Sequence, residues 1–510
     1  MHIDTSELEN FSTIEGDLCV IGAGAAGISM ALDWIGTGKS VILLEAGGFD
    51  YEPEIQELYQ GENIGQRYYS LTAARLRFFG GTTNHWGGYC APLDPIDFTN
   101  RAWVPHSGWP ITFEDLKPYY PKAQELVEIP PHPWDLEYWL KKDPELQALP
   151  LDDKVMQTKI FQFSPPTKFG KVYRKAIVES KNVTLYTHAN LTDIQINPSE
   201  SAVRSCIIKS QHGHTHTVKA KHFVLAMGAI ENARMLMASS TQAPNGLGND
   251  YDQVGRYFME HPEIQTGQLL LPAPGPMKLY TLEFLKSHMY GELTLSQETQ
   301  QKEKVLNGTL FMHPTPLSRK KAWIDIYPKD GEGSLALMGD AVRNSKTENK
   351  PDINLSKYRQ FQIQTRMEQA PNPASRVTLA NEKDQLGVPK VLLNWQLTDL
   401  DKYTNKIMHQ LLAMEVGKAG VGRLQIPEWI TDNEAPWPST LGGGWHHMGT
   451  TRMHDDPKQG VTDANGKVHG LENLHCAGSS CFTTGGAANP TLTLIALTLR
   501  LSEHLKTLTD

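Results

Sequence analysis

The chain has 510 residues, enough for about two to four domains, and a formal net charge of −9 at pH 7. This charge argues against a nucleic-acid-binding surface. The sequence contains no run of about 18 apolar residues, the length needed to cross a membrane. The acidic, polar first residues lack the basic and apolar regions of a secretion signal. The five cysteines are scattered and odd in number, so we expect a reducing, cytoplasmic compartment, with Cys19 and Cys206 as buried thiols.

A βαβ unit is predicted near the start of the chain. The apolar residues 17–21 predict a buried strand, residues 25–36 a helix, and residues 40–44 a second buried strand. Glu45 and Ala46 follow the second strand, at a distance from the first turn where a carboxylate can accept a hydrogen bond from a ribose hydroxyl.

The turn between the first strand and the helix has the spacing Gly-x-Gly-x-x-Gly. Gly22 allows the tight turn, Gly24 lets a pyrophosphate approach the backbone, and Gly27 lets the helix pack closely on the strand. The helix start, at Ala25 and Ala26, offers free N–H groups and a positive dipole end to the phosphates. In this strand–turn–helix–strand context the pattern predicts binding of an adenine dinucleotide.

A second glycine-rich stretch spans residues 75–88. It combines paired glycines with small hydroxyls, an amide, a histidine and a tryptophan, which suits backbone wrapped closely around a flat polar ligand. A surface loop rarely carries bulky aromatic residues among so many glycines. The candidates for cofactor contact in this stretch are Gly80, Gly81, Thr82, Asn84, His85, Trp86 and Gly87.

These features resemble the glucose–methanol–choline (GMC) oxidoreductase family of flavoproteins. Residues 224–234 resemble the family's second flavin strand and turn, and residues 254–262 resemble its Val-Gly…His-Pro signature. His446 begins a His-x-x-Gly-Thr motif, and residues 486–493 are most similar to the pyranose oxidase branch. The ordered matches extend over nearly the whole chain.

The resemblance implies an α/β fold with a Rossmann-like FAD-binding domain and a second, α+β substrate domain built on an antiparallel sheet. The alternating residues 305–312 and 361–368 and the helical period of residues 399–416 agree with such a second domain. We assign the FAD-binding domain to residues 1–100, 156–268 and 437–510, and the substrate-binding domain to residues 101–155 and 269–436. Composition favours a loop over a substrate lid for residues 318–352.

The resemblance also implies further FAD contacts. The adenine ring is expected at Ala189 and Leu191, and the start of the C-terminal helix is expected at the flavin edge where negative charge develops on reduction. The remaining expected contacts are Ala226, Gly228, Gly478, Pro490 and Thr491.

Oxidation of an alcohol needs a base for the hydroxyl proton and an acceptor for hydride. By resemblance His446 is the base and Asn489 holds the substrate oxygen, in the position where other family members carry a second histidine. His447 competes with His446, but in an extended segment the two rings point to opposite faces, and the spacing to Gly449 and Thr450 favours His446.

His85 raises a second hypothesis. In some relatives a histidine at this loop position is attached covalently to the flavin, and the alternative is non-covalent packing against the ring. Gly87 departs from pyranose oxidase, which has a hydroxyl residue there, so no oxygen reactivity is inferred from this loop.

The predicted function is FAD-dependent oxidation of a hydroxyl of a sugar, glycoside or related alcohol, with oxygen, a quinone or a redox protein as acceptor. The alternatives are a dehydrogenase subunit docked to a cytochrome partner, and a flavoprotein with a structural or non-redox lyase role. A mobile nicotinamide fits the additional loops less well than a flavin.

His212, His214 and His216 alternate on a predicted hairpin, where we expect solvated side chains and not a metal site. The oligomeric state is left open.

Overall fold

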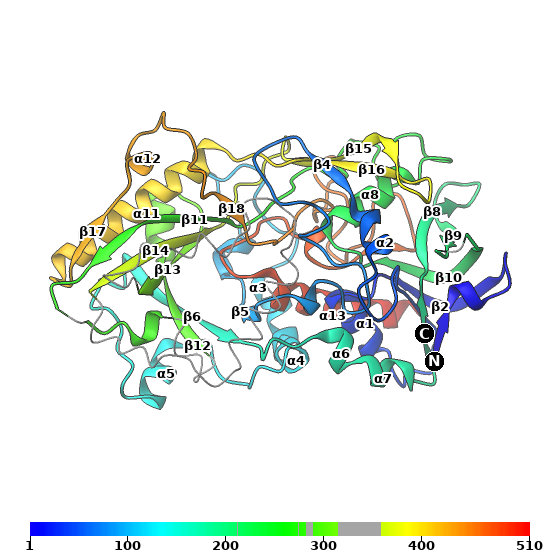
Figure 1. The fold of residues 1–510 in the computed structure, drawn as a ribbon, viewed down its shortest axis with the longest axis horizontal. Helices are drawn as coiled ribbons and strands as arrows, with labels where there is room; N and C mark the ends of the chain where they lie inside the picture. Colours follow the sequence, from blue (N-terminus) through cyan, green and yellow to red (C-terminus); the bar gives the residue numbers. More distant parts are fainter. Residues whose placement is uncertain (212, 274, 282–288, 315–358, 510) are drawn as a thin grey trace.

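The computed structural model describes residues 1–510 except 212, 274, 282–288, 315–358 and 510. Two large sheets lie at opposite ends of an elongated molecule, and both chain termini lie at the end that holds the first sheet (Figure 1). The predicted lid-or-loop segment, residues 318–352, lies outside the described residues.

The first sheet is the predicted nucleotide-binding sheet. It has the order β1-β7-β3-β2-β10-β9-β8, with β19 paired to β10. The central strands are parallel and apolar, as expected when helices cover both faces, and β9 and β8 add an antiparallel edge. The strands are β1 (His2–Asp4), β2 (Thr13–Ile21), β3 (Val41–Leu44), β7 (Val183–Thr187), β8 (Asn190–Ile196), β9 (Val203–Lys209), β10 (Thr215–Leu225) and β19 (Leu474–Cys476).

Three of the longer helices lie in this half. The predicted first helix is α1 (Ala25–Asp33), and α8 (Ala229–Ala238) follows β10. The C-terminal helix α13 (Pro490–Thr509) packs against α1, where Trp34 Nε1 donates a hydrogen bond to Ser502 Oγ at 3.0 Å. The βαβ unit and the start of the last helix at Pro490 are therefore confirmed.

The second sheet is antiparallel, with the order β17-β11-β14-β13-β12-β6-β5 and β18 paired to β11. Helix α11 (Asp399–Lys418) covers one face, where Met408 and Leu412 join a core with Phe361 and Ile363. This confirms an antiparallel sheet with a helix on one side. The strands are β5 (Tyr89–Cys90), β6 (Met156–Phe163), β11 (Pro262–Leu270), β12 (Met289–Leu295), β13 (Gly308–Pro314), β14 (Gln360–Met367), β17 (Arg423–Gln425) and β18 (Gly442–Gly443).

Strands β5, β6 and most of β11 come from segments assigned above to the FAD-binding domain, so the second sheet draws on both predicted domains. A small third sheet, β15-β16-β4, bridges distant segments as well. Its strands are β15 (Arg376–Lys383), β16 (Pro389–Asn394) and β4 (Gly61–Asn63). The remaining helices are short: α2 (Pro53–Gln56), α3 (Phe113–Leu116), α4 (Tyr120–Leu126), α5 (Leu136–Lys142), α6 (Phe169–Val172), α7 (Arg174–Val178), α9 (Gln297–Glu303) and α12 (Glu428–Thr431).

The expectation of solvated hairpin histidines is wrong for His216, which is fully buried. Its Nε2 lies 3.1 Å from the carbonyl oxygen of Thr5, because the N-terminal segment packs over the β9–β10 hairpin. His214 meets the same segment at the Leu8 carbonyl oxygen, and His212 lies outside the described residues. No cluster of three or more metal-ligating side chains occurs in the described part of the chain.

All five cysteines are buried and free, which confirms the buried thiols expected at Cys19 and Cys206. Within the described ranges no helix combines the length and the apolar character needed to span a bilayer.

Candidate active site and cofactor site

The glycines of the first turn have the contacts that the sequence pattern predicts. A Cβ atom on Gly27 would lie 1.9 Å from the Gly22 carbonyl oxygen, and one on Gly22 would lie 2.7 Å from the Ala226 carbonyl oxygen. At Gly24 a Cβ atom would meet no described atom within 4 Å. The turn is therefore packed tightly on the protein side and open at Gly24, the N-cap of α1.

Glu45 lies beside this turn and is 5% exposed. Its carboxylate oxygens accept hydrogen bonds from the Ala23 and Gly47 N–H groups, both at 3.1 Å, and burial raises the pKa of this carboxyl group. The Glu45 carbonyl oxygen accepts a hydrogen bond from Ala189 N–H at 2.8 Å. The expected ribose and adenine contacts therefore lie next to each other; Leu191, two residues further on, is buried in β8.

The second glycine-rich stretch passes directly over the first turn. Gly80 N–H donates to the Ala23 carbonyl oxygen at 2.8 Å, and a Cβ on Gly81 would lie 3.1 Å from Gly24 Cα. Asn84 holds the stretch in shape by donating to the Phe79 and Gly81 carbonyl oxygens, both at 3.0 Å. The Trp86 indole N–H donates a hydrogen bond to the Thr167 carbonyl oxygen at 2.9 Å, while Thr82 and Gly87 are exposed.

Two further glycines complete this cradle. Gly228 and Gly478 have φ angles of +85° and +94°, which favour glycine. A Cβ on Gly228 would meet no described atom within 4 Å, and the nearest atom to one on Gly478 would be Ala26 Cβ at 3.7 Å. Turns that follow β2, β10 and β19 thus meet at one edge of the first sheet, beside the start of α1.

His446 connects the two halves of the molecule through a chain of hydrogen bonds. Its Nδ1 lies 2.9 Å from Nδ1 of His261, just before β11, and its Nε2 lies 3.0 Å from Nδ2 of Asn489, just before α13. Asn489 Oδ1 is buried and has no hydrogen-bond partner among the described residues. The sequence-predicted pair, His446 and Asn489, is therefore together in space.

Hydrogen-bond chemistry fixes the protons along this chain. Nε2 of His261 lies 2.9 Å from the carbonyl oxygen of Gly486, which can only accept, so this nitrogen carries a proton. Burial lowers the pKa of His261 to about 3, so the ring is neutral and its Nδ1 accepts. His446 must then donate from Nδ1, so its Nε2 carries the lone pair and accepts a hydrogen bond from Asn489 Nδ2.

The His446 ring is neutral as well. Burial lowers its pKa well below the usual value, and the neighbouring His261 and the Arg366 guanidinium lower it further. Arg366 is itself buried and pairs with Glu263 at 3.0 Å and Glu292 at 3.2 Å. Nε2 of His446 is thus a buried base that is unprotonated at neutral pH.

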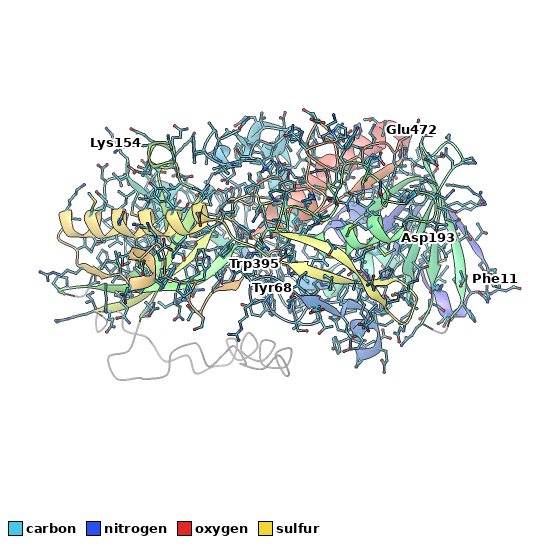
Figure 2. The ribbon with its side chains drawn as sticks, turned by 90° about the horizontal axis from the view of Figure 1, so that it is seen from above. Phe11, Tyr68, Lys154, Asp193, Trp395 and Glu472 are labelled. Carbon is cyan, nitrogen blue, oxygen red and sulfur yellow. The ribbon has the colours of Figure 1, made fainter. Side chains whose placement is uncertain are left out.

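His447 faces a different cluster, as the alternation of an extended segment predicts. Its Nε2 lies 2.8 Å from the oxygen of the Tyr68 hydroxyl, whose one proton is donated to Glu260 Oε1 at 2.8 Å. Glu260 accepts hydrogen bonds from the backbone N–H groups of Gly444 and His261, at 2.7 and 3.2 Å, and burial raises its pKa to about 8. Tyr68 lies in the middle of the molecule, in contact with Trp395 (Figure 2).

His85 is held by an aromatic contact. Its ring stacks on Trp445 with a centroid distance of 5.1 Å and an interplanar angle of 29°, and burial lowers the pKa of His85 to about 4. The indole Nε1 of Trp445 is buried and has no hydrogen-bond partner within the described ranges.

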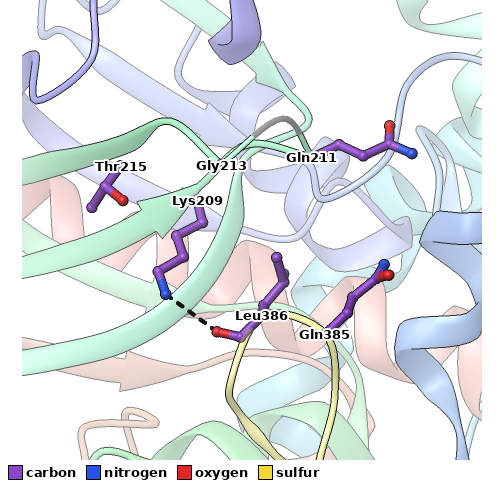
Figure 3. Close-up of a pocket in the computed structure, with 6 residues that line it drawn as sticks. All are labelled: Lys209, Gln211, Gly213, Thr215, Gln385 and Leu386. Atoms are coloured by element: carbon purple, nitrogen blue, oxygen red, sulfur yellow. Dashed lines mark hydrogen bonds between the residues drawn. The ribbon is translucent and has the colours of Figure 1, made fainter.

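Sequence reasoning assigned no role to His261, Glu260, Tyr68 or Trp445. His261 and Glu260 were within reach, because the Val-Gly…His-Pro signature at residues 254–262 contains both; nothing in the sequence marks Tyr68 or Trp445. A separate hollow of about 310 Å³ at the β9–β10 hairpin offers no comparable chemistry (Figure 3). It is lined by Lys209, Gln211, Gly213, Thr215, Gln385 and Leu386.

The donor set fits a flavin dinucleotide. The backbone is open at Gly24 and Gly228 beside the buried carboxylate of Glu45. The orphaned polar atoms of Asn489 and Trp445 flank His446, which bonds to Asn489 and follows Trp445 in the chain. This fold and site define the class of FAD-dependent oxidoreductases with a dinucleotide-binding domain.

Comparisons with known proteins agree. The model of the FAD dependent oxidoreductases matches residues 17–244, and that of the C-terminal part of the GMC oxidoreductases matches residues 371–498. These matches agree with the resemblance to the GMC oxidoreductase family that the sequence motifs indicate.

The relatives match the chain along nearly its whole length. The chain is 24% identical to 2-methyl-1,2-propanediol dehydrogenase of Mycolicibacterium austroafricanum, covering 97% of this chain and 96% of that one. It is 21% identical to the fructose dehydrogenase large subunit of Gluconobacter japonicus, covering 97% and 98%. The crystal structure of pyridoxine 4-oxidase from Mesorbium loti has the same fold, with a TM-score of 0.55, 15% identity, and 96% and 98% coverage.

The glycines of the first turn allow a matched test of the cofactor site. Gly27→Ala places a Cβ against rigid backbone, so we expect a loss of about 2 kcal/mol or more in the free energy of unfolding. Gly24→Ala has space in the protein and should unfold like the wild-type apoprotein, yet bind FAD at least about tenfold more weakly, since the pyrophosphate needs that space. Thermal melts of the apoproteins and FAD titration by fluorescence check both; a Gly24→Ala protein with unchanged FAD affinity would contradict this site.

Proposed function

We propose that the protein oxidises a hydroxyl group of a sugar, glycoside or related alcohol, with His446 as the base. The observation that carries this proposal is the unprotonated Nε2 of His446, which accepts a hydrogen bond from the amide nitrogen of Asn489 at 3.0 Å, a bond that a substrate hydroxyl can replace. Two groups so close can hold one hydroxyl: its O–H donates to His446 Nε2, and its oxygen accepts from Asn489 Nδ2.

Proton removal would follow from this geometry. The hydroxyl proton moves to His446 Nε2 while the carbonyl bond forms, and the hydrogen bond from Asn489 Nδ2 favours the negative charge that develops on the oxygen. FAD, when bound, supplies the acceptor for the hydride that leaves the carbinol carbon. The proposal includes FAD contacts along the first turn, Glu45, the stretch at residues 80–87 and the start of α13. It also includes an FAD-binding domain of residues 1–100, 156–268 and 437–510 beside a substrate-binding domain of residues 101–155 and 269–436.

The substrate class is supported by the relatives, whose names refer to a diol and a sugar. The run at residues 486–493 supports a substrate of the pyranose type. For the electron acceptor we propose either oxygen or a quinone or redox-protein partner; the name of one relative as a large subunit supports the second arrangement. The five free cysteines support a reducing, cytoplasmic compartment.

The direct experiment is anaerobic titration of the FAD-loaded protein with D-glucose, methyl β-D-glucopyranoside, D-fructose, benzyl alcohol and 2-methyl-1,2-propanediol. A donor bleaches the flavin absorbance, and oxygen uptake against dye reduction then identifies the acceptor class. If no sugar or alcohol of a broad panel bleaches the flavin, the proposed oxidation is wrong, and a structural or lyase role for the flavin becomes the better explanation.

His446→Ala should slow anaerobic flavin reduction by about 100-fold or more, because a general base contributes about 10²- to 10⁴-fold. His447→Gln is the matched control: glutamine can still bond to Tyr68, so reduction should continue at nearly the wild-type rate. The opposite result, with His447 essential and His446 dispensable, would transfer the role to His447.

The pH dependence follows from the lowered pKa of His446. The neutral, proton-accepting form persists at pH values below 6.5, so the rate of flavin reduction should stay constant from pH 8 to 6.5 and fall only in more acidic solution.

His261→Leu removes the acceptor for the Nδ1–H of His446 and lets the proton settle on Nε2 of that ring. We expect reduction to slow by about tenfold or more with little change in donor Kd; an unchanged rate would show that His261 does not fix the ring.

His85 allows a test of covalent attachment. We propose His85 as the attachment site, since its ring is neutral and lies in the stretch that crosses the cofactor turn. Acid-precipitated protein should keep its yellow colour, and a tryptic peptide containing His85 should carry flavin fluorescence. Release of all flavin into the supernatant would establish non-covalent packing instead.

A further inference from the structure

Trp445 stands in a backbone conformation that a bulky residue rarely adopts. Its φ angle is +59°, in the left-handed region, directly after three glycines. Gly443 and Gly444 are required by close contacts, since a Cβ on Gly443 would lie 2.5 Å from Glu260 Oε2 and one on Gly444 would lie 2.5 Å from His446 Nδ1. At Trp445 the chain accepts strain with a large side chain, which is typical of functional sites.

The strain places the indole at the junction of the two halves. One face stacks on His85, from the stretch that crosses the cofactor turn, and Tyr69 meets the indole edge-on at 5.6 Å and 88°. The next residue along the chain is His446. The indole therefore lies beside the stretch that crosses the cofactor turn, one residue before the proposed base.

The indole N–H lacks an acceptor. Nε1 is buried, yet no described residue accepts its hydrogen bond. A buried donor without a partner is costly, and tryptophan N–H groups usually find an acceptor when buried. An acceptor on a bound molecule would satisfy this donor, and both a substrate hydroxyl and a flavin oxygen have the necessary lone pair.

We propose that Trp445 is a substrate-binding residue: its indole N–H donates to a second oxygen of the bound sugar, and its ring packs against the sugar's C–H face. This rests on the proposed function. A second contact point fixes which hydroxyl lies between His446 and Asn489, and so favours a polyhydroxylated substrate over a simple monohydric alcohol.

The test compares Trp445→Phe with Trp429→Phe, the same change on α12, where Trp429 packs against Trp437 instead. The probes are D-glucose, methyl β-D-glucopyranoside and D-fructose, and the one that bleaches wild-type flavin at the lowest concentration is used throughout. Anaerobic stopped-flow gives its Kd and the limiting reduction rate separately, and resting flavin absorbance and FAD Kd are measured on the same samples.

For Trp445→Phe we expect the sugar Kd to rise about fivefold, the effect of one neutral hydrogen bond, with a limiting rate within about twofold of wild type. Benzyl alcohol, if oxidised, should lose no affinity, and Trp429→Phe should match wild type. Flavin absorbance and FAD Kd should not change.

Two results would overturn the proposal while leaving the proposed function intact. An unchanged sugar Kd would show that the indole N–H of Trp445 does not donate a hydrogen bond to the substrate. A shifted flavin spectrum or weaker FAD binding, without a change in sugar Kd, would assign the indole to the flavin. Failure of every sugar and alcohol to bleach the wild-type protein would instead defeat the proposed function, and this inference with it.

Discussion

The hydrogen bond between the rings of His261 and His446 determines the chemistry that the site can perform. A histidine can be a base at either nitrogen, and its partners decide which one. Here two backbone carbonyl oxygens determine the proton on His261, and His261 in turn determines the proton on His446. The direction of the lone pair is thus set by main-chain atoms on the far side of a neighbouring ring.

The fold holds these two rings together through strand pairing. Pro262 pairs with Gly443 across β11 and β18, and Met259 pairs with Met448 on the other side of the two histidines. Between these two points Glu260 accepts hydrogen bonds from both strands, at Gly444 and at His261. The register of a short ladder therefore aligns His261 with His446, and the glycines allow the strands to approach.

Much of the cofactor half could be predicted from the sequence, because its determinants are local. The apolar runs and the positions of Gly22, Gly24 and Gly27 define a βαβ unit without knowledge of the rest of the chain, and the alternation at residues 446–447 correctly separates the two rings. The contact of His261 with His446 could not be predicted, because the two residues are 185 positions apart and only a strand ladder brings them together.

Other features depended on packing that no local pattern encodes. His216 is buried because the first residues of the chain fold back over its hairpin, which a reading of the hairpin alone could not foresee. Trp445 looks like an ordinary aromatic residue in the sequence; only its φ angle and its orphaned N–H distinguish it. The second sheet likewise contains strands from both predicted domains, because tertiary pairing decides which strands join it.

This sharing of strands has a mechanical consequence. Because β5, β6 and β11 continue directly from cofactor-binding segments into the second sheet, the two halves cannot swing apart about a simple linker as tethered domains do. Strain introduced at the cradle passes through covalent backbone into the opposite end of the molecule. The protein should therefore denature in one cooperative step, and the holoprotein should resist proteolysis at both ends better than the apoprotein does.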